Sequence, residues 1–116
     1  MKIIIESPQF TVNEQLQEYT IKKAGKLSHI DERLIKCEIT LKLNNSDTDD
    51  NKICEIKVSG DQKNLFASGR NQTFEGAITE VIHAIEKQLK KEKVKARRDG
   101  RKIEIGSEAN EEETGV

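Results

Sequence analysis

Residues 34 to 43 read LIKCEITLKL, and apolar side chains occupy every second position of this run: Ile35, Cys37, Ile39, Leu41 and Leu43. Alternation with a period of two puts these side chains on one face of a β-strand and the intervening polar ones on the other. The tract NNSDTDDN at 44–51 follows and is rich in turn-forming residues. Residues 54 to 58 then alternate in the same way. We therefore predict a hairpin of two strands with one buried and one polar face.

The residues before this hairpin predict one strand and one helix. The β-branched run KIIIE at 2–6 reads as a strand, and Ser7-Pro8 ends it. Residues 11–14, TVNE, fit a capping box in which Thr11 is the N-cap residue. Apolar residues then recur at helical spacing, so we expect a helix that ends near His29.

The residues after the hairpin predict a fourth strand and a long helix. Ser59-Gly60-Asp61 indicates a turn, and 65–68 a short strand. A helix beginning around 71–73 has an apolar stripe made of Phe74, Ala77, Ile78, Val81, Ile82, Ile85 and Leu89. The order β-α-β-β-β-α predicts an α+β fold, a four-stranded sheet with two helices packed on one face. We expect residues 1–98 to form this domain and 99–116 to be a disordered tail, first basic and then acidic.

Positive charge is concentrated in one segment, although the net charge of the 116-residue chain is only −1. Nine Lys or Arg and two acids lie between Lys87 and Lys102, whereas residues 103–116 contain five acids and no base. At about 100° per residue, most of these cations fall within an arc of roughly 140°, nearly opposite the apolar stripe. A helix dipole accounts for about two or three cations at a helix C-terminus. We therefore expect a polyphosphate partner, and nucleic acid first of all.

The mode of nucleic-acid binding is constrained by the other residues. Aromatic residues make up 3% of the chain, and Tyr19 and Phe74 fall in core stripes, so a platform that stacks single-stranded bases is not expected. Lys22, Lys23 and Lys26 add a second basic cluster in the first helix. Two basic helices on one side of a sheet would contact RNA through its phosphates. A membrane-surface helix is disfavoured because the apolar side is needed for the core.

Two helical stretches, together with the element order, resemble a known family. Leu16 to Leu27 read L-x-E-Y-x-x-K-K-x-x-K-L, and Phe74 to Lys93 read F-x-x-A-I-x-x-x-I-x-x-I-E-x-Q-L-x-K-x-K. This combination is similar to the ribosome hibernation promoting factors, also known as ribosome-associated inhibitor A or sigma-factor modulation protein. The chain resembles a short form, because nothing in it could form the second, dimerising domain of long members.

The resemblance implies a function. Members have a fold similar to double-stranded RNA-binding domains, bind the small ribosomal subunit in the channel used by mRNA and tRNA, and silence translation in stationary phase. It therefore implies a cytoplasmic, bacterial, stress-response protein that needs no cofactor and is a monomer when free. The implied contacts with ribosomal RNA phosphates are Lys22, Lys23, Lys26, Lys87, Lys90, Lys91, Lys93 and Lys95. Arg97 and Arg98 continue the basic run and are added as candidate RNA contacts.

Two other functions stay open on the residues alone. One is a general double-stranded RNA-binding module. The other is a protein-interaction module whose basic helix meets an acidic partner and regulates transcription. The sequence contains no Ser-His-Asp set, Gly-rich phosphate loop or paired core carboxylate, so we expect neither catalysis nor a small-molecule substrate.

The cysteines and histidines are given no functional role. In the predicted hairpin Cys37 lies opposite Val58 and Cys54 opposite Leu41, which puts the thiols too far apart for a disulfide. We expect two buried free thiols. The two histidines have no ligand-type residues at metal-binding spacing, so no metal site is predicted. No apolar run is long enough for a membrane helix.

Overall fold

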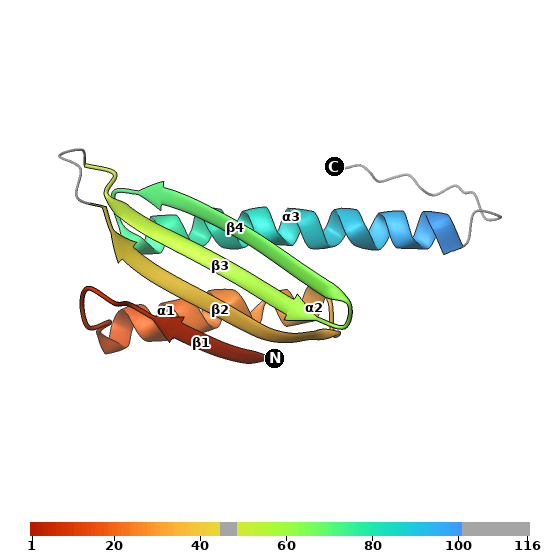
Figure 1. Ribbon diagram of the computed structural model, residues 1–116, viewed down its shortest axis with the longest axis horizontal. Coiled ribbons are helices and arrows are strands. Elements are labelled where there is room, and N and C mark those ends of the chain that lie inside the picture. The colour runs from red at the N-terminus through yellow and green to blue at the C-terminus, as the bar shows by residue number, and fades with distance from the viewer. Residues whose placement is uncertain (45–48, 101–116) are drawn as a thin grey trace.

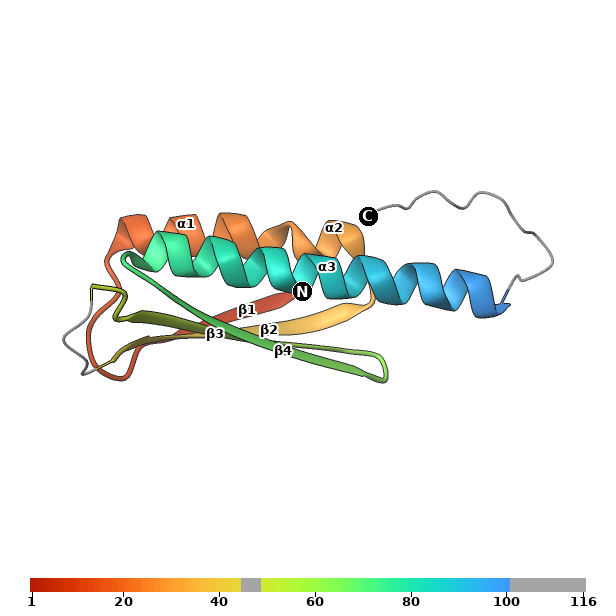
Figure 2. The ribbon, with the colours of Figure 1, turned by 90° about the horizontal axis from the view of Figure 1, so that it is seen from above.

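The computed structural model describes residues 1–44 and 49–100, with the backbone alone for 93–100. A four-stranded sheet has the order β1-β2-β3-β4, and the helices cover one of its faces (Figures 1 and 2). The elements are β1 (Lys2–Glu6), α1 (Glu14–Gly25), α2 (Leu27–Ile30), β2 (Leu34–Leu43), β3 (Lys52–Gly60), β4 (Lys63–Asn71) and α3 (Phe74–Gly100). The predicted α+β fold is thus confirmed, with α2 as a short addition to the two long helices.

The sheet is mixed. β1 pairs with β2 in parallel, and α1 makes the crossover between them, whereas β2, β3 and β4 follow one another as an antiparallel meander. Cys37 pairs with Val58 and Leu41 with Cys54, so the predicted register is confirmed. Both thiols are buried and free. Burial raises the pKa of Cys37 to about 11 and that of Cys54 to about 12.

The core lies between the sheet and the helices. Alternate residues of β2 and β3 enter it, and α3 contributes its apolar stripe from the other side: Cys37, Ile39, Leu41, Cys54, Ile56, Val58, Ala77, Ile78, Val81, Ile82, Ile85 and Leu89. These side chains all come from the predicted patterns. Both periodicities, two in the strands and 3.6 in the helix, therefore point into one core.

The predicted orientation of Ile35 is wrong. Its side chain is 63% exposed, because the β2–β3 register shifts between Leu34 and Lys36 and Leu34 is buried in its place. Leu43, at the end of β2, is 36% exposed, which is also more than the alternation predicts. The strand therefore keeps its period of two only between the bulge and its last residue.

The first helix begins later than predicted, and Thr11 is not its N-cap. The cap is Asn13, whose Oδ1 accepts a hydrogen bond of 2.8 Å from the amide of Leu16. At the other end, the amide of Lys26 donates to the carbonyl of Lys23 at 3.3 Å, which tightens the last turn before α2. The helical path reaches Ile30, close to the predicted end at His29.

The β3–β4 connection also differs from the prediction. Ser59 and Gly60 belong to β3, and the turn lies at Asp61 and Gln62, where Gln62 has a φ of 57°. A Cβ atom on Gly60 would lie 2.7 Å from the carbonyl oxygen of Arg33, so only glycine fits there. β4 is longer than the predicted 65–68 because it pairs with β3 along its whole length.

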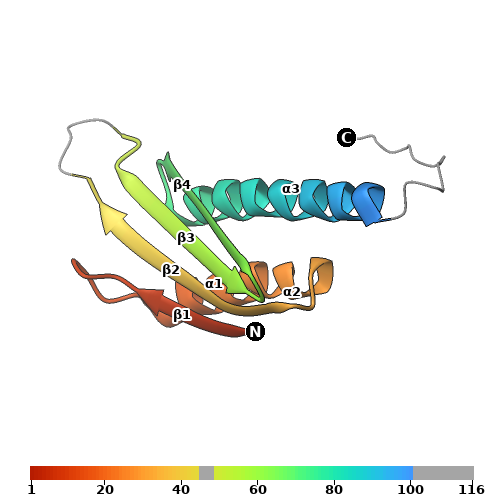
Figure 3. The same cartoon turned by 45° about the vertical axis from the view of Figure 1, so that its right-hand side comes forward.

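The long helix α3 starts where it was predicted. The Thr73 hydroxyl oxygen accepts a hydrogen bond of 3.0 Å from the amide of Gly76. The helix runs to Gly100 and continues past the end of the sheet where the β3–β4 turn lies (Figures 1 and 3). Across the described residues, no helix is both long and apolar enough to cross a membrane.

Candidate nucleic-acid interface

Helices α1 and α3 lie side by side and run in the same direction (Figure 2). The hydroxyl oxygens of Tyr19 on α1 and Thr79 on α3 are 2.6 Å apart and share a hydrogen bond. Because the helices are parallel, residues one turn further along each, Lys23 and His83, are also at the same level. The next turn brings Lys26 to the level of Lys87. The structure thus brings the two predicted basic clusters together.

We call the described lysine side chains of this helix pair the lysine surface: Lys22, Lys23, Lys26, Lys87, Lys90 and Lys91. All are exposed except Lys23, which is half-buried. Its ammonium lies 5.5 Å from the centre of the Tyr19 ring, a cation–π contact. None of the six forms an ion pair with an acidic side chain in the described part of the chain. Their charge is therefore available to a partner.

Charge along the helix pair is polarised. The first two turns of α1 and of α3 carry exposed acids, and the lysines come later in both helices; the acids are Glu14, Glu18, Glu75 and Glu80. Half-buried Glu86 directly precedes Lys87 on α3, and its Oε1 is 3.8 Å from Nδ1 of His83. Acids at the start of each helix and lysines toward its end are the distribution that the helix dipole favours. The described cations of the helix pair are therefore concentrated where α1 ends and α3 continues.

The remaining predicted contacts lie further along α3. Lys93, Lys95, Arg97 and Arg98 are in the helical backbone between Leu89 and Gly100, and their side chains are outside the described part of the structure. Their assignment as RNA contacts stays a prediction. Their backbone positions nevertheless extend the line of cationic residues beyond the sheet.

The opposite, open face of the sheet differs in its charge. Three of the cations there pair with acids: Lys36 with Glu38 at 3.7 Å, Lys42 with Glu55 at 3.1 Å, and Arg70 with Asp50 at 3.8 Å. Mixed and paired charges give a weaker field than unpaired ones. The helix side is therefore the better candidate for a polyanion.

Sequence reasoning did not find the exposure of Phe66, which is 58% exposed on β4. Its partner across the strand pair is Lys57, which is also exposed. Because β4 is an edge strand without apolar alternation, nothing in its pattern fixes which side chains face out. A single exposed aromatic ring does not make a base-stacking platform of the kind that binds single strands.

A cluster of four charged side chains, called the ion cluster below, was also missed. Lys63 Nζ is 2.5 Å from Asp31 Oδ2 and 3.2 Å from Glu92 Oε1, and Arg33 Nε is 3.1 Å from Asp31 Oδ1. Burial raises the pKa of Asp31, but the hydrogen bonds from Arg33 and Lys63 outweigh it and hold that pKa well below its usual range. The one signal in the sequence was Glu92, an acid on the packing side of α3 just after Leu89.

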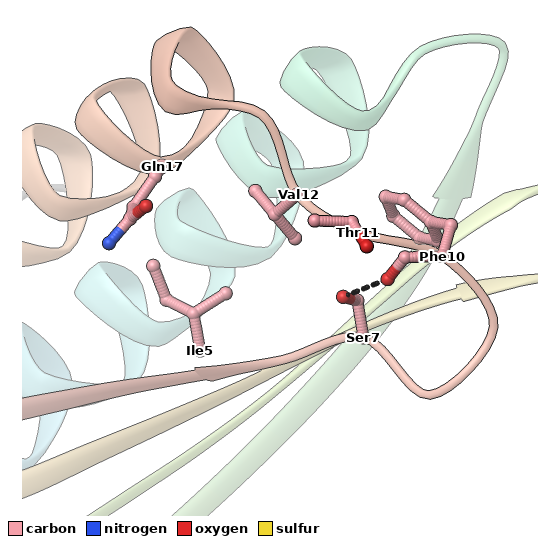
Figure 4. Close-up of a pocket in the computed structure, with 6 residues that line it drawn as sticks. All are labelled: Ile5, Ser7, Phe10, Thr11, Val12 and Gln17. Carbon is pink, nitrogen blue, oxygen red and sulfur yellow. Dashed lines mark hydrogen bonds between the residues drawn. The ribbon is translucent and has the colours of Figure 1, made fainter.

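The surface of the described residues includes two hollows, one of which is lined by His29, Ile30, Asp31, Glu32 and Arg33. The one in Figure 4 has a volume of about 320 Å³ and is lined by Ile5, Ser7, Phe10, Thr11, Val12 and Gln17. Its Ser7 hydroxyl donates a hydrogen bond of 2.6 Å to the carbonyl of Phe10 (Figure 4). No base or acid is among these lining residues. Elsewhere in the described residues, His, Cys, Asp and Glu side chains do not gather in groups of three that could hold a metal ion.

Comparison with known proteins gives a family match. Residues 3–97 match the model of the family described as "Sigma 54 modulation protein / S30EA ribosomal protein". The chain belongs to this family. The resemblance drawn from the Leu16–Leu27 and Phe74–Lys93 stretches is thereby confirmed.

Solved structures of similar proteins share the fold. A ribosomal subunit interface protein from Coxiella burnetii has a TM-score of 0.72 and 20% identity, over 80% of this chain and 98% of its own. The N-terminal domain of Thermus thermophilus Protein Y has a TM-score of 0.68 and 17% identity, over 78% of this chain and 98% of its own. At these identities the likeness establishes the architecture. No curated protein sequence matches the chain.

Proposed function

We propose that this family member binds the small ribosomal subunit through the lysine surface and silences translation by occupying the channel for mRNA and tRNA. The observation that carries the proposal is the meeting of two lysine clusters on adjacent parallel helices, joined through Tyr19 and Thr79, without ion pairs to acids among the described side chains. Membership of a family described as a ribosomal protein supports the same partner. The proposal assigns binding to residues 1–98.

The chemistry of the surface favours RNA phosphates as its ligands. Lysine ammonium groups are compact, strongly hydrated charges that pair with phosphate oxygens without a fixed geometry. Lys22 and Lys26 on one helix and Lys87 and Lys90 on the other can contact separate segments of RNA backbone at the same time. A folded ribosomal RNA offers such neighbouring segments, whereas a single phosphorylated ligand does not.

Inhibition requires no chemical step in this proposal. A protein wedged between RNA elements of the decoding channel excludes mRNA and the anticodon stems of tRNA sterically. Inhibition should therefore be reversible and competitive. In a cell-free translation reaction, initiation complexes formed beforehand should protect the ribosome from added protein. Cleaved RNA, or inhibition that pre-bound tRNA does not relieve, would contradict this mechanism.

The site is tested by charge reversal. The triple variant Lys87→Glu, Lys90→Glu, Lys91→Glu should fold normally, because these exposed positions oppose the buried stripe of α3, and should no longer co-sediment with small subunits. The matched control reverses three lysines of the open sheet face, Lys2, Lys36 and Lys57, and should still bind. Equal binding by both folded variants would defeat the site assignment.

Salt dependence and a second ligand separate the alternatives. Each phosphate contact with a nucleic acid releases about 0.7 to 0.9 of a counterion, so the affinity should fall steeply as the salt concentration rises. Binding to naked duplex RNA as tight as to small subunits would favour a general RNA-binding module. Binding to neither would favour a protein partner.

A further inference from the structure

The described part of α3 loses its apolar contact with the sheet after Leu89. Leu89 is 1% exposed, and the described side chains that follow it are the exposed Lys90 and Lys91 and the half-buried Glu92. The helix nevertheless continues to Gly100, and from Glu92 onward it rises a further distance of about 12 Å. Among the described side chains, Glu92 is the last that can hold the orientation of these turns.

Glu92 is held by the ion cluster. Its Oε1 is 3.2 Å from Lys63 Nζ, and that ammonium is also 2.5 Å from Oδ2 of Asp31. Lys63 begins β4, while Asp31 follows α2, so one lysine joins three separate segments. The Lys63 side chain is only 13% exposed, which means that its charge is committed to these carboxylates.

The base of this attachment is itself rigid. The β3–β4 turn places Lys63 directly after Gln62, which has the positive φ of 57° that a tight connection needs. Gly60, just before the turn, packs so closely on the backbone of Arg33 that a Cβ would approach its carbonyl oxygen to 2.7 Å. Lys63 is therefore presented to Glu92 from a fixed backbone.

We infer that Lys63 and Glu92, supported by Asp31, are positioning residues for RNA binding: they set the angle at which α3 leaves the sheet. This angle fixes where the basic residues after Glu92 lie relative to the cations of α1. The inference rests on the proposed function, because it concerns how the lysine surface fits its partner. A rotation at Glu92 would be amplified along the last turns of the helix, where the basic run continues.

The sign of one substitution separates positioning from simple electrostatics. Glu92→Gln removes a negative charge from a basic helix, so electrostatics alone predicts tighter RNA binding. Positioning predicts binding that is weaker by about three- to tenfold. It also predicts that the slope of log affinity against log salt concentration is smaller in magnitude by about one, because fewer phosphates are contacted together. The matched control is Glu86→Gln, which makes the same charge change on the same helix outside the ion cluster; its binding should be unchanged or tighter.

Substitution of Lys63 gives a second comparison. Because the Lys63 ammonium is enclosed by Asp31 and Glu92, its loss cannot remove a direct phosphate contact. Lys63→Met should nevertheless weaken binding to the same extent as Glu92→Gln, and the double variant should be no weaker than either single one. Thermal unfolding of each variant checks that the comparison is made between folded proteins.

A distance measurement tests the geometry without any ribosome. Spin labels are attached to Ser68→Cys on β4 and Asp99→Cys near the end of α3; the buried Cys37 and Cys54 thiols should stay unlabelled. The electron–electron distance distribution should be narrow in the parent and in Glu86→Gln, and broader in Glu92→Gln and Lys63→Met. An unchanged distribution, or undiminished binding by Glu92→Gln, would overturn the inference.

The two proposals fail in different ways. If the parent protein does not co-sediment with small subunits, the proposed function fails, and the distance distributions alone decide whether the ion cluster positions α3. If the parent binds and Glu92→Gln behaves like Glu86→Gln in both experiments, the proposed function stands and the positioning role is rejected.

Discussion

The hydroxyl groups of Tyr19 and Thr79 lie 2.6 Å apart, and their exposed hydrogen bond joins α1 to α3 one turn before Lys23. We expect Tyr19→Phe and Thr79→Val each to lower the free energy of unfolding by about 0.5 to 1.5 kcal/mol, since each removes one hydrogen bond. The double variant should cost less than the sum of the two, because both remove the same bond. Urea unfolding measures all three. Strict additivity would show that the hydroxyls do not interact in solution.

A second prediction concerns acid. Because the pKa of Asp31 is held below its usual range by Arg33 and Lys63, its ion pairs stabilise the folded state above about pH 4, and this contribution is lost progressively as the pH falls further. Asp31→Asn should therefore lower the free energy of unfolding by about 2 kcal/mol at pH 7 and by much less at pH 2. Asp61→Asn, at an exposed position in the nearby turn, is the control. An equal cost of Asp31→Asn at both pH values would contradict the ion pairing.

A third prediction concerns alkali. Burial raises the pKa values of Cys37 and Cys54 to about 11 and about 12, from an ordinary 9.0, so unfolding releases thiol protons once the pH exceeds about 9. Stability from the neutral thiols is present below that pH and lost as it rises through these raised values. Between pH 8 and 10.5 the wild-type protein should lose more stability than Cys37→Ala, Cys54→Ala. Parallel stability curves would show that the thiols do not titrate on unfolding.

Two glycines give a fourth prediction. Gly60→Ala places a methyl group 2.7 Å from the carbonyl oxygen of Arg33, so the backbone must shift, and we expect a loss of about 1 to 3 kcal/mol. Gly25→Ala meets nothing within 4 Å and lies in the last turn of α1, so it should be neutral or stabilise by up to about 1 kcal/mol. Denaturation midpoints compare them. Equal effects of the two substitutions on stability would indicate that the backbone at the β3–β4 turn can shift at little cost.

The parts of the fold that sequence predicted are those governed by a period. Alternation placed Cys37 and Cys54 in the core and gave their register, and the helical stripe through Ile82 and Leu89 gave the packing side of α3. The packing side of α3 also indicated which side of the helix is exposed. This in turn predicted Lys87 as part of the candidate interface. The sequence predicted the orientation of side chains wherever apolar residues recur at one regular spacing along a strand or helix that buries one face.

The misses have local or long-range causes. A bulge at the start of β2 turns the Ile35 side chain to the exposed side. The few residues around it have no pattern that would predict this bulge. Thr11 and Asn13 are both good capping residues, and sequence could not choose between them. The ion cluster brings Asp31, Lys63 and Glu92 together from three elements, so no spacing along the chain announces it.

The position of α3 after the last strand has a consequence for synthesis. Its apolar stripe, from Ala77 to Leu89, supplies one side of the core, so the inner face of the completed sheet stays uncovered until this helix has been translated. β1 and α1 are made first, but β1 can pair only after β2, its parallel partner, has been made. Likewise, Tyr19 can form its hydrogen bond only after Thr79 has been made. A nascent chain therefore assembles its paired lysine clusters last. The same late helix completes both the folded core and the charged surface, so an unfinished chain has neither.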